Sequence, residues 1–244
     1  MSVTAVGTAG AVGTPPVPVP AAGTCEVWLV PVRRRAAWAA LLDADERERW
    51  EALGEGPAAD TLLTSRAAQR LIVSRYCGLP PNSLSIERSC GLCGAPRHGR
   101  PRLPGAAFDF SVSHTRDWLL LAVVGTGLVG ADLDHLDPDR DTDGLAALTL
   151  TPTERRAYDQ LPSAERPVAF LDSWVRKEAA IKLTGHGLAA PPAAIDTSGP
   201  VVQAPSVPNW PAAPVHVTPL PAPDGHRAAL ATTTPVTRLR SRAL

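Results

Sequence analysis

Apolar residues along the chain follow both the two-residue period of strands and the 3.6-residue period of helices. A short apolar run at residues 26–32 predicts a strand, alternation at 108–112 predicts another, and a last strand is expected at 227–233. Two further apolar runs, 118–124 and 128–133, flank Gly125-Thr126-Gly127, and this arrangement predicts a β-hairpin.

Helical periodicity dominates the segments between these strands. Residues 33–53 and 60–76 each place apolar side chains at helical spacing and end before glycine and proline. Two more helices are expected at 152–160, capped by Thr151, and at 166–184, stopped by Gly185. The order of elements is α+β, and a strand-helix-helix-strand-strand pattern can be traced twice, although no residue-level repeat is visible.

The ends of the chain differ in composition from its middle. Residues 1–24 are apolar, are broken by Pro15, Pro16, Pro18 and Pro20, and have neither a basic segment nor a membrane-spanning run, which predicts a disordered leader. We expect an N-terminal half over 25–118, a C-terminal half over 119–234 and a basic tail over 235–244.

Charge and cysteine content narrow the functional classes. Lys+Arg and Asp+Glu both number 24, so no overall field attracts the protein to nucleic acid or an anionic membrane, and any phosphate chemistry must be local. Lysine occurs only at Lys177 and Lys182, in one short segment that also holds Glu178. The 4 cysteines are too few and too unevenly spaced for the disulfide framework of a small secreted domain, which favours a reducing cytoplasm.

Two carboxylates end the predicted strand at 128–133. Asp132 and Asp134 are two residues apart, so they point to the same face of the sheet and repel each other. A divalent cation would remove that cost, and hard oxygen ligands at this spacing suit magnesium. The alternative from spacing alone is a solvated strand end, which the acidic stretch that follows would also produce.

The predicted helix at 166–184 carries a second acidic candidate. Glu178 falls in its apolar stripe, four residues after Trp174 and three before Ile181, so its carboxylate should be partly buried and need a partner. A metal shared with the aspartates would supply that partner, and Lys182 at i+4 would point into the same site. The alternative is an ordinary surface Glu–Lys pair.

Other candidate residues lie upstream of the hairpin. Ser113 and His114 close a strand just before it, which puts an imidazole near the proposed metal as a phosphate contact. Cys90, Cys93 and His98 offer at most three zinc ligands, one fewer than a closed structural site needs, so unligated thiols are favoured. The basic residues of the same loop are Arg97, Arg100 and Arg102.

Together these motifs resemble the Sfp-type phosphopantetheinyl transferases, a monomeric class that activates peptide and polyketide synthases. That family builds a magnesium site from a G-x-D-x-E strand and a W-x-x-K-E-A-x-x-K helix, which are similar to residues 130–134 and 174–182 here. Its N-x-SHS and G-K-P segments resemble 109–115 and Gly99-Arg100-Pro101, and the resemblance extends from about 47 to 188.

The resemblance implies an α+β fold of the 4'-phosphopantetheinyl transferase type, with two similar halves packed as a pseudo-dimer. It further implies transfer of phosphopantetheine from coenzyme A to a serine of an apo acyl or peptidyl carrier protein, with Mg²⁺ as cofactor. A cytoplasmic monomer serving secondary metabolism, such as antibiotic biosynthesis, would fit that class.

The resemblance also assigns roles to residues. Asp132, Asp134 and Glu178 would bind magnesium, with Glu178 as general base and Lys182 stabilising the departing phosphate. Two departures from the family pattern stand out: Asp134 replaces glutamate, so this shorter arm would reach the metal only through water, and Asp109 stands where asparagine is common. The residues implied to contact coenzyme A are Arg49, Arg100, Ser113, His114, Lys177 and Lys182, with Arg49 at the 3'-phosphate and Arg100 near the nucleotide.

Two other functions remain open from the sequence. The Asp132-Leu-Asp134 triplet has the D-x-D form with which metal-dependent glycosyltransferases hold a nucleotide diphosphate, although that function leaves the lysine-bearing helix unexplained. A non-catalytic module that binds a carrier protein or coenzyme A is the other alternative, and the shortened Asp134 is its only argument.

Overall fold

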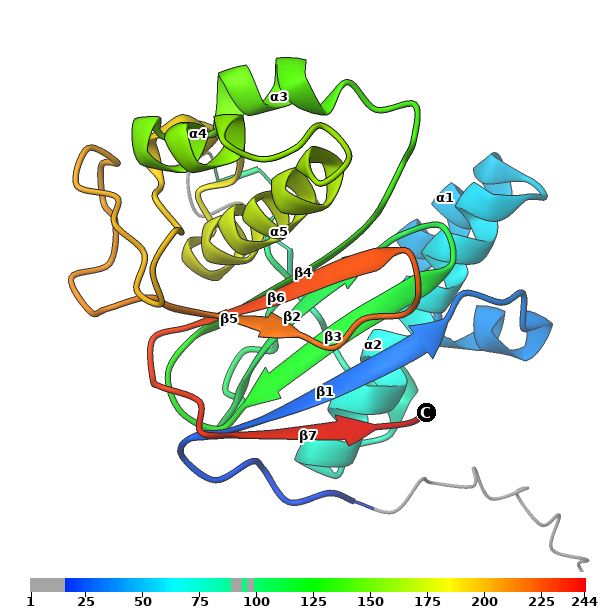
Figure 1. The fold of residues 1–244 in the computed structure, drawn as a ribbon. Helices are drawn as coiled ribbons and strands as arrows, with labels where there is room; N and C mark the ends of the chain where they lie inside the picture. Colours follow the sequence, from blue (N-terminus) through cyan, green and yellow to red (C-terminus); the bar gives the residue numbers. More distant parts are fainter. Residues whose placement is uncertain (1–15, 89–93, 96–98) are drawn as a thin grey trace, which may run out of the picture.

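Two β-sheets, each covered by one long helix, make up the part of the chain that the computed structural model describes, residues 16–88, 94–95 and 99–244 (Figure 1). The first sheet has the order β2-β3-β1-β7, and β7 is the strand that runs parallel to its neighbour. Its strands are β1 (Thr24–Pro31), β2 (Asp109–His114), β3 (Trp118–Val124) and β7 (Arg238–Arg242). The second sheet, antiparallel throughout, consists of β4 (Val129–His135), β6 (His226–Thr232) and β5 (His216–Leu220) in that order.

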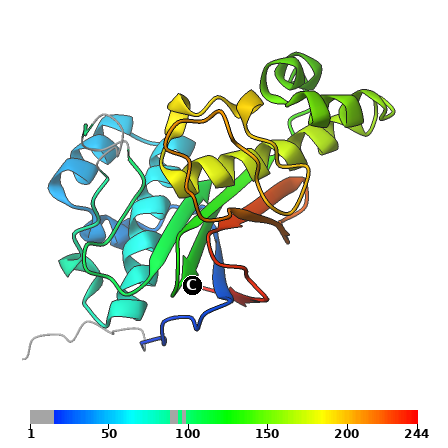
Figure 2. The same ribbon diagram turned by 90° about the vertical axis from the view of Figure 1, so that its left-hand side faces the viewer.

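The two halves share one topology. In each, the first strand pairs with the third, and the second strand lies beyond the third: β1-β3-β2 in one half and β4-β6-β5 in the other. A long helix follows the first strand in both cases, α2 (Pro57–Cys77) and α5 (Arg166–Thr184). The α+β class and the two similar halves predicted above are therefore confirmed. Figure 2 shows the N-terminal helices on one side of the molecule and the C-terminal helices on the other.

The helices begin and end where local chemistry dictates. α1 (Ala44–Leu53) starts with a capping box between Asp43 and Glu46, and α4 (Pro152–Asp159) has the same device at Thr151. Both long helices stop at a glycine in the left-handed conformation, Gly78 and Gly185. The segment predicted as one helix at 33–53 is instead divided into the 3-10 helix η1 (Ala36–Leu41) and α1, and a short helix, α3 (Thr142–Thr149), follows β4.

The predicted hairpin between 118–124 and 128–133 is wrong. β3 pairs with β1 on one side and β2 on the other, whereas β4 pairs with β6 in the second sheet. Both edges of β3 are already occupied, so the chain leaves the first sheet at residues 125–127 and starts the other one. The sheets pack face to face instead, and their contact buries side chains such as Leu120, Ala122, Leu133 and Leu230.

Both chain ends contribute contacts to the first half. Val17, within the predicted leader, is buried, and its amide donates a 2.8 Å hydrogen bond to the carbonyl of Arg75 in α2. The predicted basic tail contains β7, whose Arg242 pairs with the buried carboxylate of Glu26 at 2.7 Å. Of the described helices, none combines the length and apolar character needed to cross a bilayer.

Candidate active site

A glycine brings the two main motifs together where α5 crosses β4. A Cβ atom at Gly130 would overlap the carbonyl oxygen of Ala179 and lie 2.5 Å from the amide nitrogen of Leu183. Any side chain would therefore push the helix off the strand. Gly130 thus has a packing role, and the close approach places Asp132 beside the helix positions that carry Glu178 and Lys182.

Asp132 and Lys182 form an ion pair at this crossing. The Lys182 Nζ lies 2.6 Å from Asp132 Oδ1, and it also donates to Ser113 Oγ at 2.8 Å. The Ser113 hydroxyl donates to the same Asp132 oxygen at 2.8 Å. Asp132 is only 5% exposed, so the lysine offsets the cost of burying its charge. Three of the predicted site residues, one from each of β2, β4 and α5, therefore meet.

Glu178 is the half-buried carboxylate that the helical stripe predicted. Its side chain makes neither a hydrogen bond nor an ion pair within the described part of the chain. Burial raises the pKa of Glu178, and the neighbouring charge of Asp132 raises it further, while Lys182 opposes the shift and Asp134 adds a smaller repulsion. The site therefore holds an excess of negative charge that a cation would stabilise.

Asp134 has a different partner. The Arg140 guanidinium binds it through two nitrogens, at 2.7 and 3.3 Å, and the His135 amide donates to it at 2.7 Å. Burial alone would raise the pKa of Asp134, but the hydrogen bonds and charge of Arg140 together with the His135 amide lower it below its ordinary value. This carboxylate is consequently already neutralised by the protein.

The donor set fits a hard divalent cation in part. Asp132 and Glu178 are adjacent carboxylates whose mutual repulsion a cation would relieve, which is the chemistry that Mg²⁺ requires. Across residues 16–88, 94–95 and 99–244, however, no group of three or more His, Cys, Asp or Glu side chains is arranged to hold a metal ion. The predicted trio of Asp132, Asp134 and Glu178 is not assembled as one cluster.

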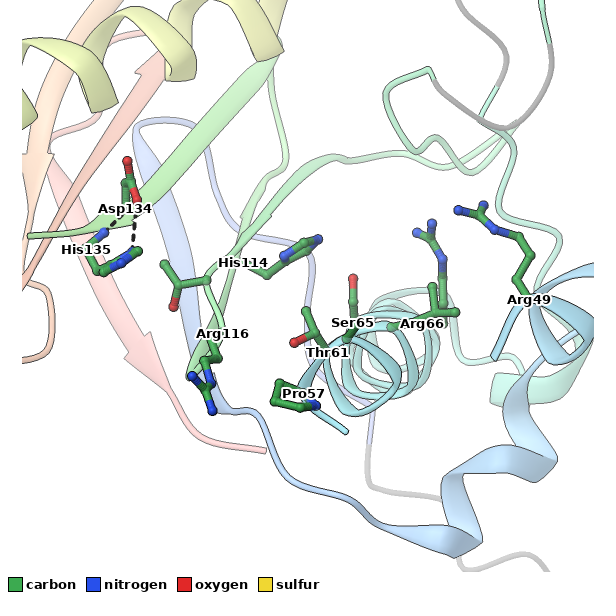
Figure 3. A pocket seen from close by; sticks show the side chains of 12 residues that line it. Arg49, Pro57, Thr61, Ser65, Arg66, His114, Arg116, Asp134 and His135 are labelled. Carbon is green, nitrogen blue, oxygen red and sulfur yellow. Dashed lines mark hydrogen bonds and ion pairs between the residues drawn. The ribbon is translucent and has the colours of Figure 1, made fainter. Parts of the chain in front are cut away.

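A cleft of about 600 Å³ opens beside this cluster, between α2 and the end of β2 (Figure 3). One wall is the first turns of α2, and Figure 3 shows Pro57, Thr61 and Ser65 along it. The amide groups at a helix N-terminus attract anions. The cationic and imidazole side chains that line the cleft are Arg49, Arg66, His114, Arg116 and His135.

His114 joins the cleft to the carboxylate cluster. Burial lowers the pKa of His114, and the positive charges of Lys182 and Arg66 lower it further. The imidazole therefore tends to be neutral and able to donate to an anion without adding to the charge of the cleft. Predicted residues Arg49 and His114 share this cleft with Asp134, while Ser113 lies at the Asp132 end.

Lys177 does not reach the site. Its side chain is fully buried, its Nζ lies 2.6 Å from Glu154 Oε2, and it donates to the carbonyls of Pro192 at 2.9 Å and of Ile195. Burial lowers the pKa of Lys177, and Glu154 opposes that shift. The structure therefore does not bring Lys177, for which the resemblance implied a contact with coenzyme A, to the carboxylate cluster. A residue five positions before Lys182 faces another side of α5, where it connects the helix to the loop that follows.

Arg100 also takes part in an ion pair within the protein. It pairs with Asp109 and donates to the Val129 carbonyl at 2.7 Å, while Asp109 accepts from the Val129 amide at 2.7 Å. The pair links the start of β2 to the start of β4 and so connects the two halves, while the nucleotide contact of Arg100 stays a prediction. It also explains the unusual Asp109, because a carboxylate there matches the buried guanidinium.

Several cleft residues were not predicted. Arg66, Arg116 and His135 gave no motif, although Thr61 and Ser65 fall four residues apart on one face of a helix, which is a weak signal for a polar face. Arg140 was not predicted either, because it lies in the acidic stretch after Asp134 and belongs to no motif. Cys90, Cys93, Arg97 and His98, considered for zinc and for the basic loop, lie outside the described residues.

Comparison with known proteins covers the region that contains this site. Residues 128–231, from the start of β4 to β6, match the family model described as the 4'-phosphopantetheinyl transferase superfamily. The chain is 30% identical over 151 residues to the 4'-phosphopantetheinyl transferase HetI of Nostoc sp., an alignment covering 62% of each chain. It is 28% identical over 168 residues to the putative 4'-phosphopantetheinyl transferase slr0495 of Synechocystis sp., over 67% of this chain and 65% of that protein. The matched region thus spans under two thirds of either relative's length. The matched residues contain the strand, the helix and the glycine at their crossing, so this part of the chain is similar to the 4'-phosphopantetheinyl transferase superfamily.

Proposed function

We propose that this protein transfers the 4'-phosphopantetheine group of coenzyme A to a serine of an apo carrier protein. The observation that carries the proposal is the continuity between a basic cleft and a carboxylate–lysine cluster, with His114 between them. The cleft suits a polyanionic nucleotide and the cluster suits the reacting phosphate. The family model that residues 128–231 match and the names of the similar proteins support the same reaction.

Each residue has a part in the proposed reaction. The serine Oγ attacks the pantetheine phosphorus, and the bond from phosphorus to the oxygen of adenosine 3',5'-bisphosphate breaks. Glu178 takes the serine proton, a role favoured by its raised pKa. Lys182 leaves Asp132 to balance charge on the departing phosphate, while His114, Arg66 and Arg49 bind the nucleotide phosphates. A Mg²⁺ ion held by Asp132 and Glu178 would supply a Lewis acid for the pyrophosphate.

The finer features follow from the same reaction. We expect a cytoplasmic monomer that binds an apo acyl or peptidyl carrier, and synthases of secondary metabolism, including antibiotic biosynthesis, as the source of that carrier. We also propose that the domains divide into an N-terminal half over 25–118 and a C-terminal half over 119–234.

The test is incubation with coenzyme A, Mg²⁺ and a panel of apo carriers, followed by intact-mass measurement of the carrier. We expect a mass gain equal to phosphopantetheine, abolished by chelation. Lys182→Met and Glu178→Gln should each slow transfer about 100-fold or more, the usual contribution of a general acid–base group or charge stabiliser.

Coenzyme A binding without transfer to any carrier would favour the non-catalytic module. Tighter binding of a nucleotide sugar than of coenzyme A would favour a glycosyltransferase.

A further inference from the structure

The two aspartates of β4 are neutralised in different ways. Asp132 receives a single lysine, a compact charge that contacts one of its oxygens, Oδ1. Asp134 receives a planar guanidinium that covers both oxygens, with Arg140 Nη1 at 2.7 Å from Oδ2 and Nη2 at 3.3 Å from Oδ1. Two-pronged arginine–carboxylate pairs are stronger and more directional than a lysine contact.

The turn after β4 fixes Arg140 in front of Asp134. The Leu136 amide donates to the Gly225 carbonyl at 2.7 Å, and the Arg140 amide donates to the Asp137 carbonyl at 3.2 Å. Asp141 then caps α3 by accepting from the Gly144 amide at 2.9 Å. Because both sides of the turn are held, the guanidinium is positioned by the backbone and loses little freedom on pairing.

We propose that Arg140 is a positioning residue that keeps Asp134 out of the metal's coordination, so that this chain binds its divalent cation with two carboxylates, Asp132 and Glu178. The inference rests on the proposed function, since it concerns the cation of that site. It departs from the three-carboxylate set that the resemblance implied. The short side chain of Asp134 and the Arg140 guanidinium act together. The short side chain limits how far the carboxylate extends toward the cation, and the guanidinium neutralises the carboxylate in place of the cation.

The arrangement also gives Arg140 a reason to remain paired when substrate binds. Asp134 lines the cleft beside His135 and Arg116, so an unpaired carboxylate there would repel an incoming phosphate. The guanidinium removes that repulsion without occupying the cleft, of which it is not a lining residue. Arg140 therefore tunes both the number of metal ligands and the charge of the cleft wall.

The experiment measures Mn²⁺ binding directly, by electron paramagnetic resonance of free Mn²⁺ with coenzyme A present. We expect Asp132→Asn and Glu178→Gln to weaken binding about 10-fold or more, as loss of a ligand does, and Asp134→Asn to change it less than about 3-fold. Arg140→Ala should tighten binding several-fold by freeing a carboxylate. The double variant Asp134→Asn/Arg140→Ala should lose that gain.

Arg155→Ala is the matched control, because it removes an arginine paired with an aspartate, Asp159, on the exposed surface of α4. It should leave Mn²⁺ affinity unchanged. Circular dichroism of each variant checks folding.

The inference would be overturned if Asp134→Asn weakened Mn²⁺ binding as much as Asp132→Asn does, or if Arg140→Ala did not tighten Mn²⁺ binding. Either result would leave wild-type transfer intact. Absence of Mn²⁺ binding by the wild type would overturn the inference and the metal role together, and loss of carrier modification alone would count against the proposed function instead.

Discussion

The two halves of the molecule have the same strand order and one long helix each, yet they carry different charges into the site: the carboxylates and Lys182 come from the C-terminal half, and arginine and histidine side chains come from the N-terminal half. The N-terminal half supplies Arg49 and Arg66 from α1 and α2, together with His114 from β2. The C-terminal half supplies Asp132 and Glu178 from β4 and α5. A repeated topology therefore provides two similar walls, and in the proposed function side-chain chemistry lets one of them bind anions and the other hold a cation.

The contact that most affects this division is the β4–α5 crossing. Gly130→Ala should have the largest effect of any single substitution at the site, because the new methyl group overlaps the Ala179 carbonyl and no flexible side chain can move away. We expect a loss of about 3 kcal/mol or more in the free energy of unfolding, together with loss of transfer activity. Urea unfolding and the carrier assay measure the two effects.

Gly199→Ala provides the control, since its new Cβ would have its nearest neighbour at 3.9 Å. That variant should unfold within about 0.5 kcal/mol of the wild type, as surface changes usually do. If Gly130→Ala were as stable and active as the control, the close packing at the crossing would not be what assembles the acidic wall.

The two lysines of α5 should differ in what they affect: Lys177 mainly stability, and Lys182 mainly catalysis. Lys177→Met leaves Glu154 buried without its 2.6 Å partner, and removing one member of a buried ion pair costs about 3–5 kcal/mol. We expect lower stability but nearly unchanged kcat per folded molecule, since Lys177 does not touch the site. Urea unfolding and active-site titration separate these quantities.

Lys182→Met should lower kcat per folded molecule strongly. It also removes a partner of the buried Asp132, but the loss of stability should be smaller than for Lys177→Met, because Lys182 is 31% exposed and Ser113 still donates to Asp132. The comparison is sharp because both substitutions are the same and lie on the same helix. Equal losses of kcat in the two variants would show that the helix as a whole, not the single lysine at the crossing, determines turnover.

On the N-terminal side, Arg66→Ala should raise the KM for coenzyme A about 10- to 100-fold with a smaller change in kcat, because one charge-assisted contact is worth about 1.5–3 kcal/mol. Steady-state kinetics with varied coenzyme A measures this. Arg155→Ala, which is not part of the cleft lining, should leave KM unchanged. A fall in kcat at constant KM would instead assign Arg66 to the reacting phosphate.

Sequence patterns predicted some of these features and missed others for physical reasons. The long helices, the paired carboxylates and Lys182 follow from periodicity and spacing, which are local properties. The hairpin failed because the partner of β4 is β6, about a hundred residues later, and nothing local specifies it. The ion pairs of Lys177 and Arg100 were not predicted because the motif gives residue types, whereas the partners Glu154 and Asp109 decide which way each cation turns.

The smallest expected effect concerns the acidic wall alone. Without metal, Glu178 is a carboxylate whose pKa is raised by burial and by Asp132, so folding favours its protonated form. Stability from this group is present below the unfolded-state pKa of about 4.3 and is lost as pH rises through the raised folded-state value.

In a chelating buffer at pH 7, Glu178→Gln should therefore melt roughly 2–4 °C higher than the wild type, and the difference should shrink toward pH 4. Added Mg²⁺ should raise the melting temperature of the wild type and remove the advantage of the variant, because the cation stabilises only the charged site. Scanning calorimetry across this pH range measures the difference, and a variant that melts below the wild type at pH 7 in chelator would mean that Glu178 already has a stabilising partner.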